Sequence, residues 1–234
     1  MVLNERTALV TGGTGALGRI IAGRLAREGA MVFASFLDEK ELQRLPQDFK
    51  ASVATLKADM TNEAQVKLLY DEIISRSSHV DIVVNAVGGF LPRKPITEVS
   101  LAEWESMMNI NLKSTFLSMR ESLRRMKGQK YGRIINISAM VGLNPTPGRA
   151  PYAISKAGVS LLTEIAAQEQ KGSGITINAV APSIIATPAN LASMPDEDSS
   201  KWVRPGEIAD LICYLCSLPA GAITGTTFKA YGGV

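Results

Sequence analysis

The sequence predicts a single α/β domain built on a doubly wound parallel sheet, and three observations lead to that fold class. Seven apolar runs rich in β-branched residues alternate with helix-like stretches, and such alternation is typical of a parallel sheet with right-handed crossovers. The runs are continuously apolar, which indicates strands covered on both faces. A glycine-rich turn follows the first run. One domain, residues 1–234, is expected for a chain of this length.

The individual elements follow from the residue pattern. In residues 16–29 apolar side chains recur at helical spacing, and the stretch ends at Gly29, a C-cap signal. Residues 61–76 begin at Thr61 or Asn62, both suitable N-cap residues, and again place apolar side chains on one face. We expect strands in the apolar runs at residues 7–13, 31–36, 52–59, 81–89, 133–138, 175–182 and 226–233.

Residues 183–206 have the least regular pattern in the chain, with several prolines and a short acidic cluster. Long irregular connections in compact domains are commonly functional lids. We therefore expect this segment to form a substrate flap over one end of the sheet. Leu191, Met194 and Trp202 in the flap, together with Phe90, suggest a partly apolar substrate.

Composition and charge favour a soluble, cytoplasmic protein that binds neither nucleic acid nor membrane. The net charge is +3, and the densest basic stretch, residues 124–133, is interpreted as a solvated helix end. We find no apolar run of about 18 residues and no basic-then-apolar leader. Cys213 and Cys216 have the spacing of a redox pair, but their helical apolar context indicates small core residues. His79 is the only histidine, so no metal site is expected.

The turn after the first strand has the composition of a phosphate-binding loop. The glycines of "TGGTGALG" allow a sharp turn and close approach of a ligand, and the next helix N-terminus presents free N–H groups to a pyrophosphate. Other strand ends carry small or polar residues at the same predicted edge, which suits a cofactor cleft. These are Asp59, Asn85–Gly89, Ser138 and Ala181–Ser183.

Tyr152 and Lys156 are four residues apart in a helix-like stretch, so both side chains are expected on one helix face. A nearby ammonium group stabilises a phenolate and lowers the phenol pKa. The pair is therefore a candidate general acid near neutral pH. Spacing alone also permits a tyrosine packed in the core and a solvated lysine.

Six motifs in order make the chain resemble the short-chain dehydrogenase/reductase family across essentially its whole length. They are "TGGTGALG", "AD" at residues 58–59, "DIVVNAVGG", "NINL", "YAISK" and "INAVAPSIIATP". The resemblance implies a Rossmann-type doubly wound sheet of about seven strands and an NAD(P)-dependent oxidoreductase. It also implies a small-molecule substrate and a homodimer or homotetramer.

The resemblance further implies roles for individual residues. Tyr152 matches the proton donor to the substrate oxygen, and Lys156 the residue that binds the nicotinamide ribose and lowers the tyrosine pKa. Asn111 matches the residue that holds a water in a proton relay. The cofactor-binding positions that the motifs imply are Gly12, Gly13, Thr14, Gly15, Leu17, Gly18, Asp59, Met60, Asn85, Pro182, Ile185 and Thr187.

The sequence departs from the family at the position of its catalytic serine. That serine usually lies 13 residues before the tyrosine and three before a glycine, and both counts, from Tyr152 and from Gly142, end at Ala139. Adjacent side chains on a strand point to opposite faces, so Ser138 is expected to point away from the site. Ser138 is therefore a doubtful candidate, and only a one-residue bulge would restore it.

The adenosine end of the cofactor site is compatible with NAD and with NADP. Phe36 stands where NAD-preferring members carry an aspartate, and the absence of an acid removes the repulsion of a 2′-phosphate. Gly15 and Leu37 occupy the positions where an arginine or lysine commonly binds that phosphate. Ser35 could donate a hydrogen bond to it. The balance favours NADP slightly.

Two features favour a branch of the family that lacks the serine. Ala16 in the glycine loop and the flap segment "TPANLASMPDEDSSKW" resemble the dihydropteridine reductases. The leading hypothesis is therefore reduction of a carbonyl or imine-like substrate, with a pterin-like compound as one form of it. The alternatives are a 3-oxoacyl or ketone reductase and, in another class, a non-catalytic nucleotide-sensing protein on the same fold.

Overall fold

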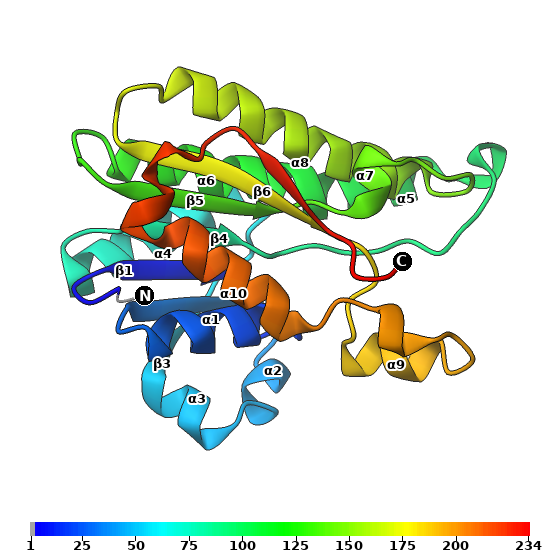
Figure 1. Cartoon of the computed structure of the whole chain (residues 1–234), viewed down its shortest axis with the longest axis horizontal. Helices are drawn as coiled ribbons and strands as arrows, with labels where there is room; N and C mark the ends of the chain where they lie inside the picture. The colour runs from blue at the N-terminus through cyan, green and yellow to red at the C-terminus, as the bar shows by residue number, and fades with distance from the viewer. Residues whose placement is uncertain (1–2) are drawn as a thin grey trace.

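The seven predicted strands form one parallel sheet. A computed structural model describes residues 3–234, in which the strand order is β3-β2-β1-β4-β5-β6-β7 (Figure 1). All neighbouring strands pair in parallel. The strands are β1 Thr7–Thr11, β2 Met31–Phe36, β3 Val53–Lys57, β4 Ile82–Asn85, β5 Gly132–Ile137, β6 Ile175–Pro182 and β7 Thr227–Ala230.

The order of the strands reverses at β1, which has β2 on one side and β4 on the other. Ligands of open parallel sheets bind beyond the carboxyl ends of the strands at such a switch point. The register aligns those ends, because Thr11 is opposite Asn85 and Asn85 is opposite Asn136. The glycine-rich turn therefore begins at the edge where a ligand is expected.

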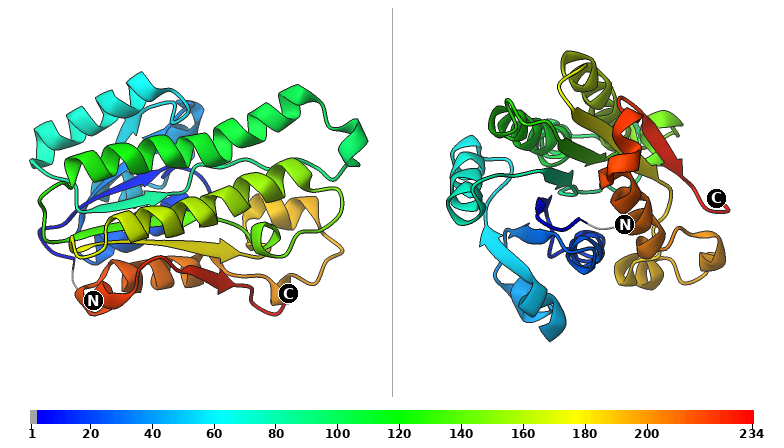
Figure 2. Two further views of the ribbon diagram at one scale, coloured as in Figure 1. Left: turned by 90° about the horizontal axis from the view of Figure 1, so that it is seen from above. Right: turned by 60° about the vertical axis from the view of Figure 1, so that its left-hand side comes forward.

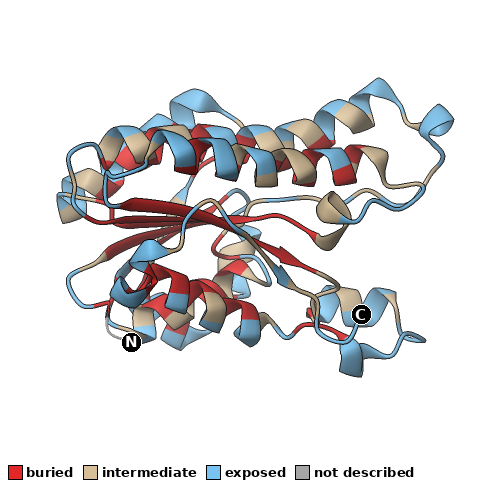
Figure 3. Ribbon diagram, turned by 45° about the horizontal axis from the view of Figure 1, so that its top comes forward, coloured by how far each residue is buried: buried red, intermediate tan, exposed pale blue. Residues whose placement is uncertain are grey.

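Helices cover both faces of the sheet in two layers (Figure 2). One layer contains α1 (Gly18–Arg27), α3 (Gln47–Ser52) and α10 (Pro205–Cys216), and their apolar faces pack with one side of the strands. The other layer contains α4 (Glu63–Ser77), α6 (Ser114–Arg125) and α8 (Ala150–Glu169). Figure 3 shows the strands as a buried band between the two layers.

Four short helices and four non-α segments complete the structure. They are α2 Lys40–Gln43, α5 Leu101–Met107, α7 Met140–Leu143, α9 Pro188–Ser193, the 3₁₀ segments Ile96–Glu98, Ser199–Lys201 and Leu218–Ala222, and the π-helical segment η2, Met108–Lys113, which joins α5 to α6. Single π turns inside α-helices occur mostly at functional sites.

The start of α4 and the end of α1 lie where their capping residues predicted them. Asn62 is the N-cap of α4, and its side chain accepts hydrogen bonds from the backbone N–H groups of Ala64 and Gln65. Gly29, just beyond α1, has φ of 95°, a left-handed conformation that favours glycine. Cys213 and Cys216 are both fully buried on α10, and burial raises the pKa of the Cys213 thiol to about 11. They are core residues, as interpreted from the sequence.

The segment 183–206 is less irregular than the sequence suggested. It contains α9 and a 3₁₀ turn, and a bridge joins Ile185 to Val203 at its two ends. Leu191 is 44% exposed, but Trp202 is only 5% exposed. The expectation that Trp202 offers an apolar surface to the substrate is therefore wrong for this conformation, because its ring is used in packing. No helix within residues 3–234 is long and apolar enough to cross a membrane.

Candidate active site

The turn between β1 and α1 is held against the end of β2. The backbone N–H of Gly12 donates to Ser35 Oγ at 3.0 Å, and that of Gly13 donates to the Ser35 carbonyl at 3.0 Å. Gly12 has φ of 61°, and a Cβ on Gly18 would overlap the Gly12 carbonyl oxygen. A larger residue at either position would distort the loop, so the glycines predicted to shape a phosphate site do shape this turn.

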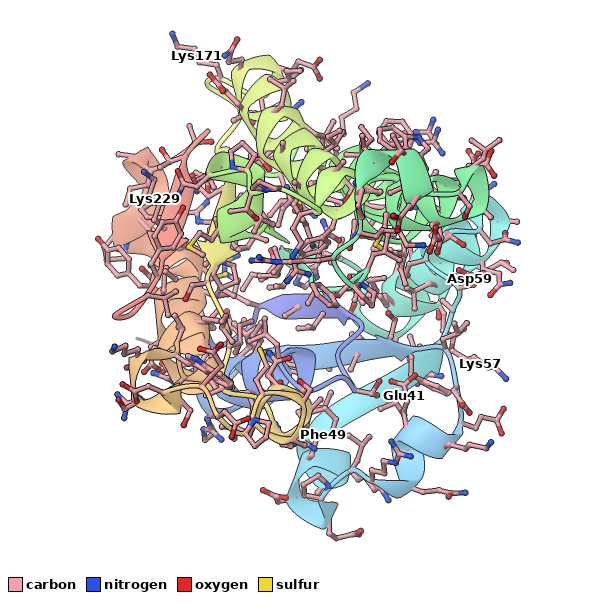
Figure 4. All side chains as sticks on the ribbon, turned by 90° about the vertical axis from the view of Figure 1, so that its right-hand side faces the viewer. Glu41, Phe49, Lys57, Asp59, Lys171 and Lys229 are labelled. Carbon is pink, nitrogen blue, oxygen red and sulfur yellow. The ribbon has the colours of Figure 1, made fainter. Side chains whose placement is uncertain are left out.

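A cavity of about 270 Å³ lies beside this loop. Asp59 and Met60, which follow β3, lie in its wall, and so does Ser35. Glu41 from α2 also lines the cavity, and its carboxylate accepts a hydrogen bond from the Thr14 hydroxyl. Figure 4 shows the labelled Glu41 and Asp59 on the same side of the molecule. The remaining walls are Gly12, Gly15, Phe36, Leu37, Ala58, Thr61, Ala86, Val87, Gly88 and Ile110.

The cavity fits the adenosine end of a dinucleotide. It is bounded by the glycine loop on one side and by the carboxyl ends of β2, β3 and β4 on the others. Apolar walls suit a purine ring, and the carboxylate and hydroxyl groups of Asp59 and Ser35 suit its polar edges. The predicted positions at this end of the site, from Gly12 to Met60, are therefore brought together.

Asn85 does not face this cavity. Its side chain is buried at 2% exposure and donates to Asn136 Oδ1 at 2.8 Å. Asn136 in turn donates to the Thr163 hydroxyl at 2.8 Å. The Asn85 side chain thus ties β4 through β5 to α8, while its successors Ala86 to Gly88 reach the cavity. A role of Asn85 in cofactor binding stays a prediction.

Asn111 and Lys156 converge on Gly88. A Cβ on Gly88 would lie 2.9 Å from Asn111 Oδ1 and 3.2 Å from Lys156 Nζ, so only glycine leaves this space open. Asn111 lies in the π-helical segment, is fully buried, and accepts a hydrogen bond from the Gly89 N–H at 2.9 Å. Its amide nitrogen donates to Ser155 Oγ at 3.1 Å, which fixes it to α8.

Lys156 is buried and donates to the Ile137 carbonyl at 2.8 Å. Burial disfavours its charged form and lowers its pKa to about 8. The ammonium group lies beside Gly88, in the wall of the cavity. Its predicted effect on the Tyr152 phenol stays a prediction.

Tyr152 is half-buried in the first turn of α8. Its ring meets Phe90 edge to face, with centroids 5.5 Å apart. Burial raises the pKa of its phenol, and the nearby Arg149 guanidinium opposes that rise. Arg149 stacks on the Phe90 ring, with its guanidinium carbon 4.4 Å from the ring centre.

Ser138 points away from the cleft, as the strand register predicts. Its hydroxyl donates to the Lys156 carbonyl at 2.9 Å and lies 2.9 Å from Ser160 Oγ. The residue is 1% exposed. Ala139 follows in an extended conformation as the N-cap of α7, and no bulge shifts the register, since Ile137 pairs with Val180 at the end of a continuous ladder. The serine position of the family carries no hydroxyl here.

The predicted residues near the flap lie where β6 ends. Pro182 is the last residue of β6, and Ile185 forms the bridge to Val203. Thr187 is 8% exposed, and its hydroxyl accepts a hydrogen bond from the Asn190 N–H at the start of α9. These residues fix the base of the flap at the same edge of the sheet.

Comparison with known proteins matches this arrangement to one family. The sequence model described as short chain dehydrogenase matches residues 6–198. The chain is a short-chain dehydrogenase/reductase. It is therefore an NAD(P)-dependent oxidoreductase by family, and the dinucleotide cavity described above has the expected position.

Several relatives resemble this short-chain dehydrogenase/reductase over nearly their full lengths. The 3-oxoacyl-[acyl-carrier-protein] reductase of Rickettsia bellii is 32% identical, covering 99% of this chain and 98% of the relative. That of Aquifex aeolicus is 31% identical with the same coverage. An uncharacterized oxidoreductase of Staphylococcus epidermidis is 28% identical, covering 93% and 94%. These relatives give no support to the dihydropteridine reductase branch, whereas the ketone-reductase alternative agrees with them.

Solved structures confirm the fold. A short-chain type dehydrogenase/reductase from Mycobacterium ulcerans superposes with a TM-score of 0.93 at 24% identity, covering 100% of this chain and 90% of that one. ElxO with NADP bound superposes with a TM-score of 0.91 at 27% identity, covering 97% and 98%.

Sequence reasoning missed two charged residues of the site. Glu41 belongs to the cavity because α2 folds back over the glycine loop. Arg149 lies beside Tyr152 because it is the N-cap residue of the same helix. The loop at residues 88–95 folds against this helix start, where Lys94 N–H donates to the Gly148 carbonyl at 3.1 Å. The arginine three residues before the tyrosine is visible in the sequence, but its contact with the Phe90 ring could not be predicted from it.

Proposed function

We propose that this protein reduces a ketone-type carbonyl group with NADPH, and that Tyr152 donates the proton to the carbonyl oxygen. The observation that carries the proposal is the position of Tyr152. It lies one helical turn from Lys156 on α8, and Lys156 lies against Gly88 in the wall of the nucleotide cavity. A proton donor and the dinucleotide therefore meet at one edge of the sheet.

The residues divide the chemistry as follows. The reduced nicotinamide supplies the hydride when the dinucleotide is bound. The Tyr152 phenol carries its proton near neutral pH and can deliver it to the developing alkoxide; burial raises its pKa and opposes that release, whereas the Arg149 guanidinium favours it. Lys156 and Asn111, both beside Gly88, would hold the ribose hydroxyls and a water molecule.

NADP(H) is proposed in preference to NAD(H) on three grounds. ElxO, at 27% identity, has been solved with NADP and with NADPH. Phe36 ends β2 without an acidic group. Ser35 Oγ accepts from the Gly12 N–H, so its own hydrogen is free to donate to a phosphate. Glu41 also brings a carboxylate to this end, and its bond with Thr14 holds that carboxylate against the loop.

A ketone is proposed as the substrate because relatives at 31–32% identity are named 3-oxoacyl-[acyl-carrier-protein] reductases. The missing hydroxyl at Ala139 leaves Tyr152 as the hydroxyl donor at this position of the site. The retained Tyr152, Lys156 and Asn111 give a non-catalytic sensing role no support.

The proposal is tested by following NADPH and NADH oxidation with a panel of ketones and 3-oxoacyl thioesters. Tyr152→Phe should lower kcat by about 10²–10⁴-fold, the usual contribution of a general acid, while NADPH binding is retained. Tyr214→Phe is the matched control, because Tyr214 is 44% exposed on α10. Full activity of Tyr152→Phe, or tight NADPH binding with no ketone reduced, would contradict the proposal.

A further inference from the structure

Arg149 lies beside the proton donor, and Arg93 lies near Arg149; neither has an acidic partner among residues 3–234. Arg149 makes one hydrogen bond, from Nη1 to the Leu91 carbonyl at 3.2 Å, and no ion pair with any residue in the described part of the chain. Arg93 is exposed and likewise has no acidic partner among those residues. Their mutual repulsion, together with partial burial, lowers the pKa of Arg149. The neighbouring Lys94, by contrast, is paired with Glu103 at 2.7 Å.

The fold holds these cations in place. Lys94 N–H is bonded to the Gly148 carbonyl, and a Cβ on Gly148 would lie 3.4 Å from Arg93 Cβ. The segment that carries Phe90 and Arg93 is thereby fixed to the start of α8. Phe90 contacts both Tyr152 and Arg149, with its ring centre 5.5 Å from that of Tyr152 and 4.4 Å from the guanidinium carbon.

This arrangement costs free energy in the absence of an anion. Arg149 is the N-cap residue of α8, but its side chain makes no capping bond. A positive charge at a helix N-terminus opposes the helix dipole, and a second unpaired arginine adds repulsion. A guanidinium has five N–H donors in a planar fork that matches a carboxylate. Only one hydrogen bond from Arg149 is satisfied by the protein.

We propose that Arg149, with Arg93 behind it, binds a carboxylate of the substrate beside Tyr152, so that the preferred substrates are oxo acids. The inference rests on the proposed function, because it specifies which ketones the same site reduces. Phe90, 58% exposed, would pack against the carbon chain of the substrate. Arg149 is thus a specificity-determining residue that sequence motifs do not identify.

The test compares each acid with its own neutral ester. The substrates are 2-oxobutanoate and 3-oxobutanoate with their methyl esters, assayed with NADPH. The wild-type kcat/KM should be at least 10-fold higher for one acid than for its ester. Arg149→Gln should lower kcat/KM for that acid by about 10–100-fold, the range of a charge-assisted hydrogen bond, and for the ester by less than about 3-fold. Arg149→Lys should recover part of the loss, because it keeps the charge without the fork.

Arg124→Gln is the matched control, since Arg124 is exposed near the far end of α6. Equal losses for acid and ester in Arg149→Gln would assign Arg149 a structural role and overturn the inference, as would a wild-type preference for both esters. If neither acid is reduced, calorimetric titration of the NADP-loaded enzyme with 3-hydroxybutanoate decides. Binding that Arg149→Gln abolishes supports the carboxylate site, and no binding to wild type overturns it.

The two proposals fail separately. Ester reduction that depends on Tyr152 but shows no preference for the acids leaves the reductase assignment intact and removes the carboxylate site. Acid reduction or acid binding that depends on Arg149 but not on Tyr152 supports the carboxylate site and contradicts the role of Tyr152 as the proton donor.

Discussion

At the scale of the residue, Ser138 and Ala139 are neighbours just beyond the end of β5 with different roles: the hydroxyl of Ser138 is used in packing, and Ala139 has no hydroxyl. The Ser138 hydroxyl is bonded to the Lys156 carbonyl and lies beside Ser160, both on α8. Its neighbour Ala139 carries only a methyl group and is 6% exposed. Ser138 therefore supports the helix that bears Tyr152 and Lys156.

Replacing Ser138 with alanine should affect stability more than catalysis. Loss of these buried hydrogen bonds should lower the free energy of unfolding by roughly 1–2 kcal/mol, whereas kcat/KM should fall less than about 3-fold. Urea denaturation and NADPH oxidation measure the two effects. Ser122→Ala, which removes another buried hydroxyl bonded within the core, is the control. A loss of activity above about 100-fold, about 2.7 kcal/mol in the barrier, would mean that Ser138 reaches the substrate.

Lys156 shows the cost of a buried charge held for function. Its pKa is lowered from 10.5 to about 8, because burial disfavours the ammonium form. Between these two values the unfolded chain binds more protons than the native one, so this residue makes stability rise with pH in that window. Below about pH 8 the full penalty is present, and above about pH 10.5 it has vanished.

We expect Lys156→Met to unfold at higher urea than wild type at pH 7, with a gain of roughly 1–3 kcal/mol. The gain should shrink at pH 9.5, since the wild-type penalty is then partly relieved. Activity should fall strongly at both pH values. Lys127→Met, an exposed site, should change neither quantity. A variant less stable than wild type at pH 7, or a gain that does not vary with pH, would show that the ammonium group is not destabilising.

At the scale of the element, the strands and the long helices could be predicted from the sequence, because the signals for them are local. Continuous β-branched runs became β1 to β7, and the N-cap at Asn62 and the glycine after α1 lie where predicted. The π-helical segment at 108–113 has no such signal. Its wider turn accompanies contacts of Asn111 with Gly89 and Ser155, which come from distant parts of the chain.

The residues of the candidate site also fall into two groups, those set by local spacing and those set by neighbours in other elements. Motif spacing located Tyr152, Lys156 and the glycine loop, because each lies at a fixed offset within one element. The side-chain directions of Asn85 and Trp202 depend on neighbours in other elements. The expectation that Trp202 offers its ring to the substrate was therefore wrong. Glu41 reaches the site because α2 folds over the glycine loop, and Arg149, the N-cap residue of α8, matches no family motif, so neither was predicted.

At the scale of the whole molecule, the outer surface of one helix layer indicates self-association. Exposed apolar side chains lie along neighbouring helices of that layer: Phe116 on α6, and Ile154, Leu161 and Ile165 on α8, each 41–59% exposed. Apolar patches of this kind mark interaction surfaces. Together with the family resemblance, they lead us to expect a homodimer or homotetramer joined through this layer.

Sedimentation equilibrium should therefore give two or four times the 25.0 kDa chain mass. Leu161→Glu combined with Ile165→Glu should shift the protein toward the monomer, because each buried carboxylate would lack a partner at the interface. Leu218→Glu is the control, since Leu218 is 71% exposed in the 3₁₀ segment that follows α10 and is not part of α6 or α8. If the double variant keeps the wild-type mass, another surface joins the subunits; a monomeric wild type would remove the expectation altogether. Because Tyr152 and Arg149 lie at the start of α8, dissociation is also expected to lower activity by loosening the first turn of that helix.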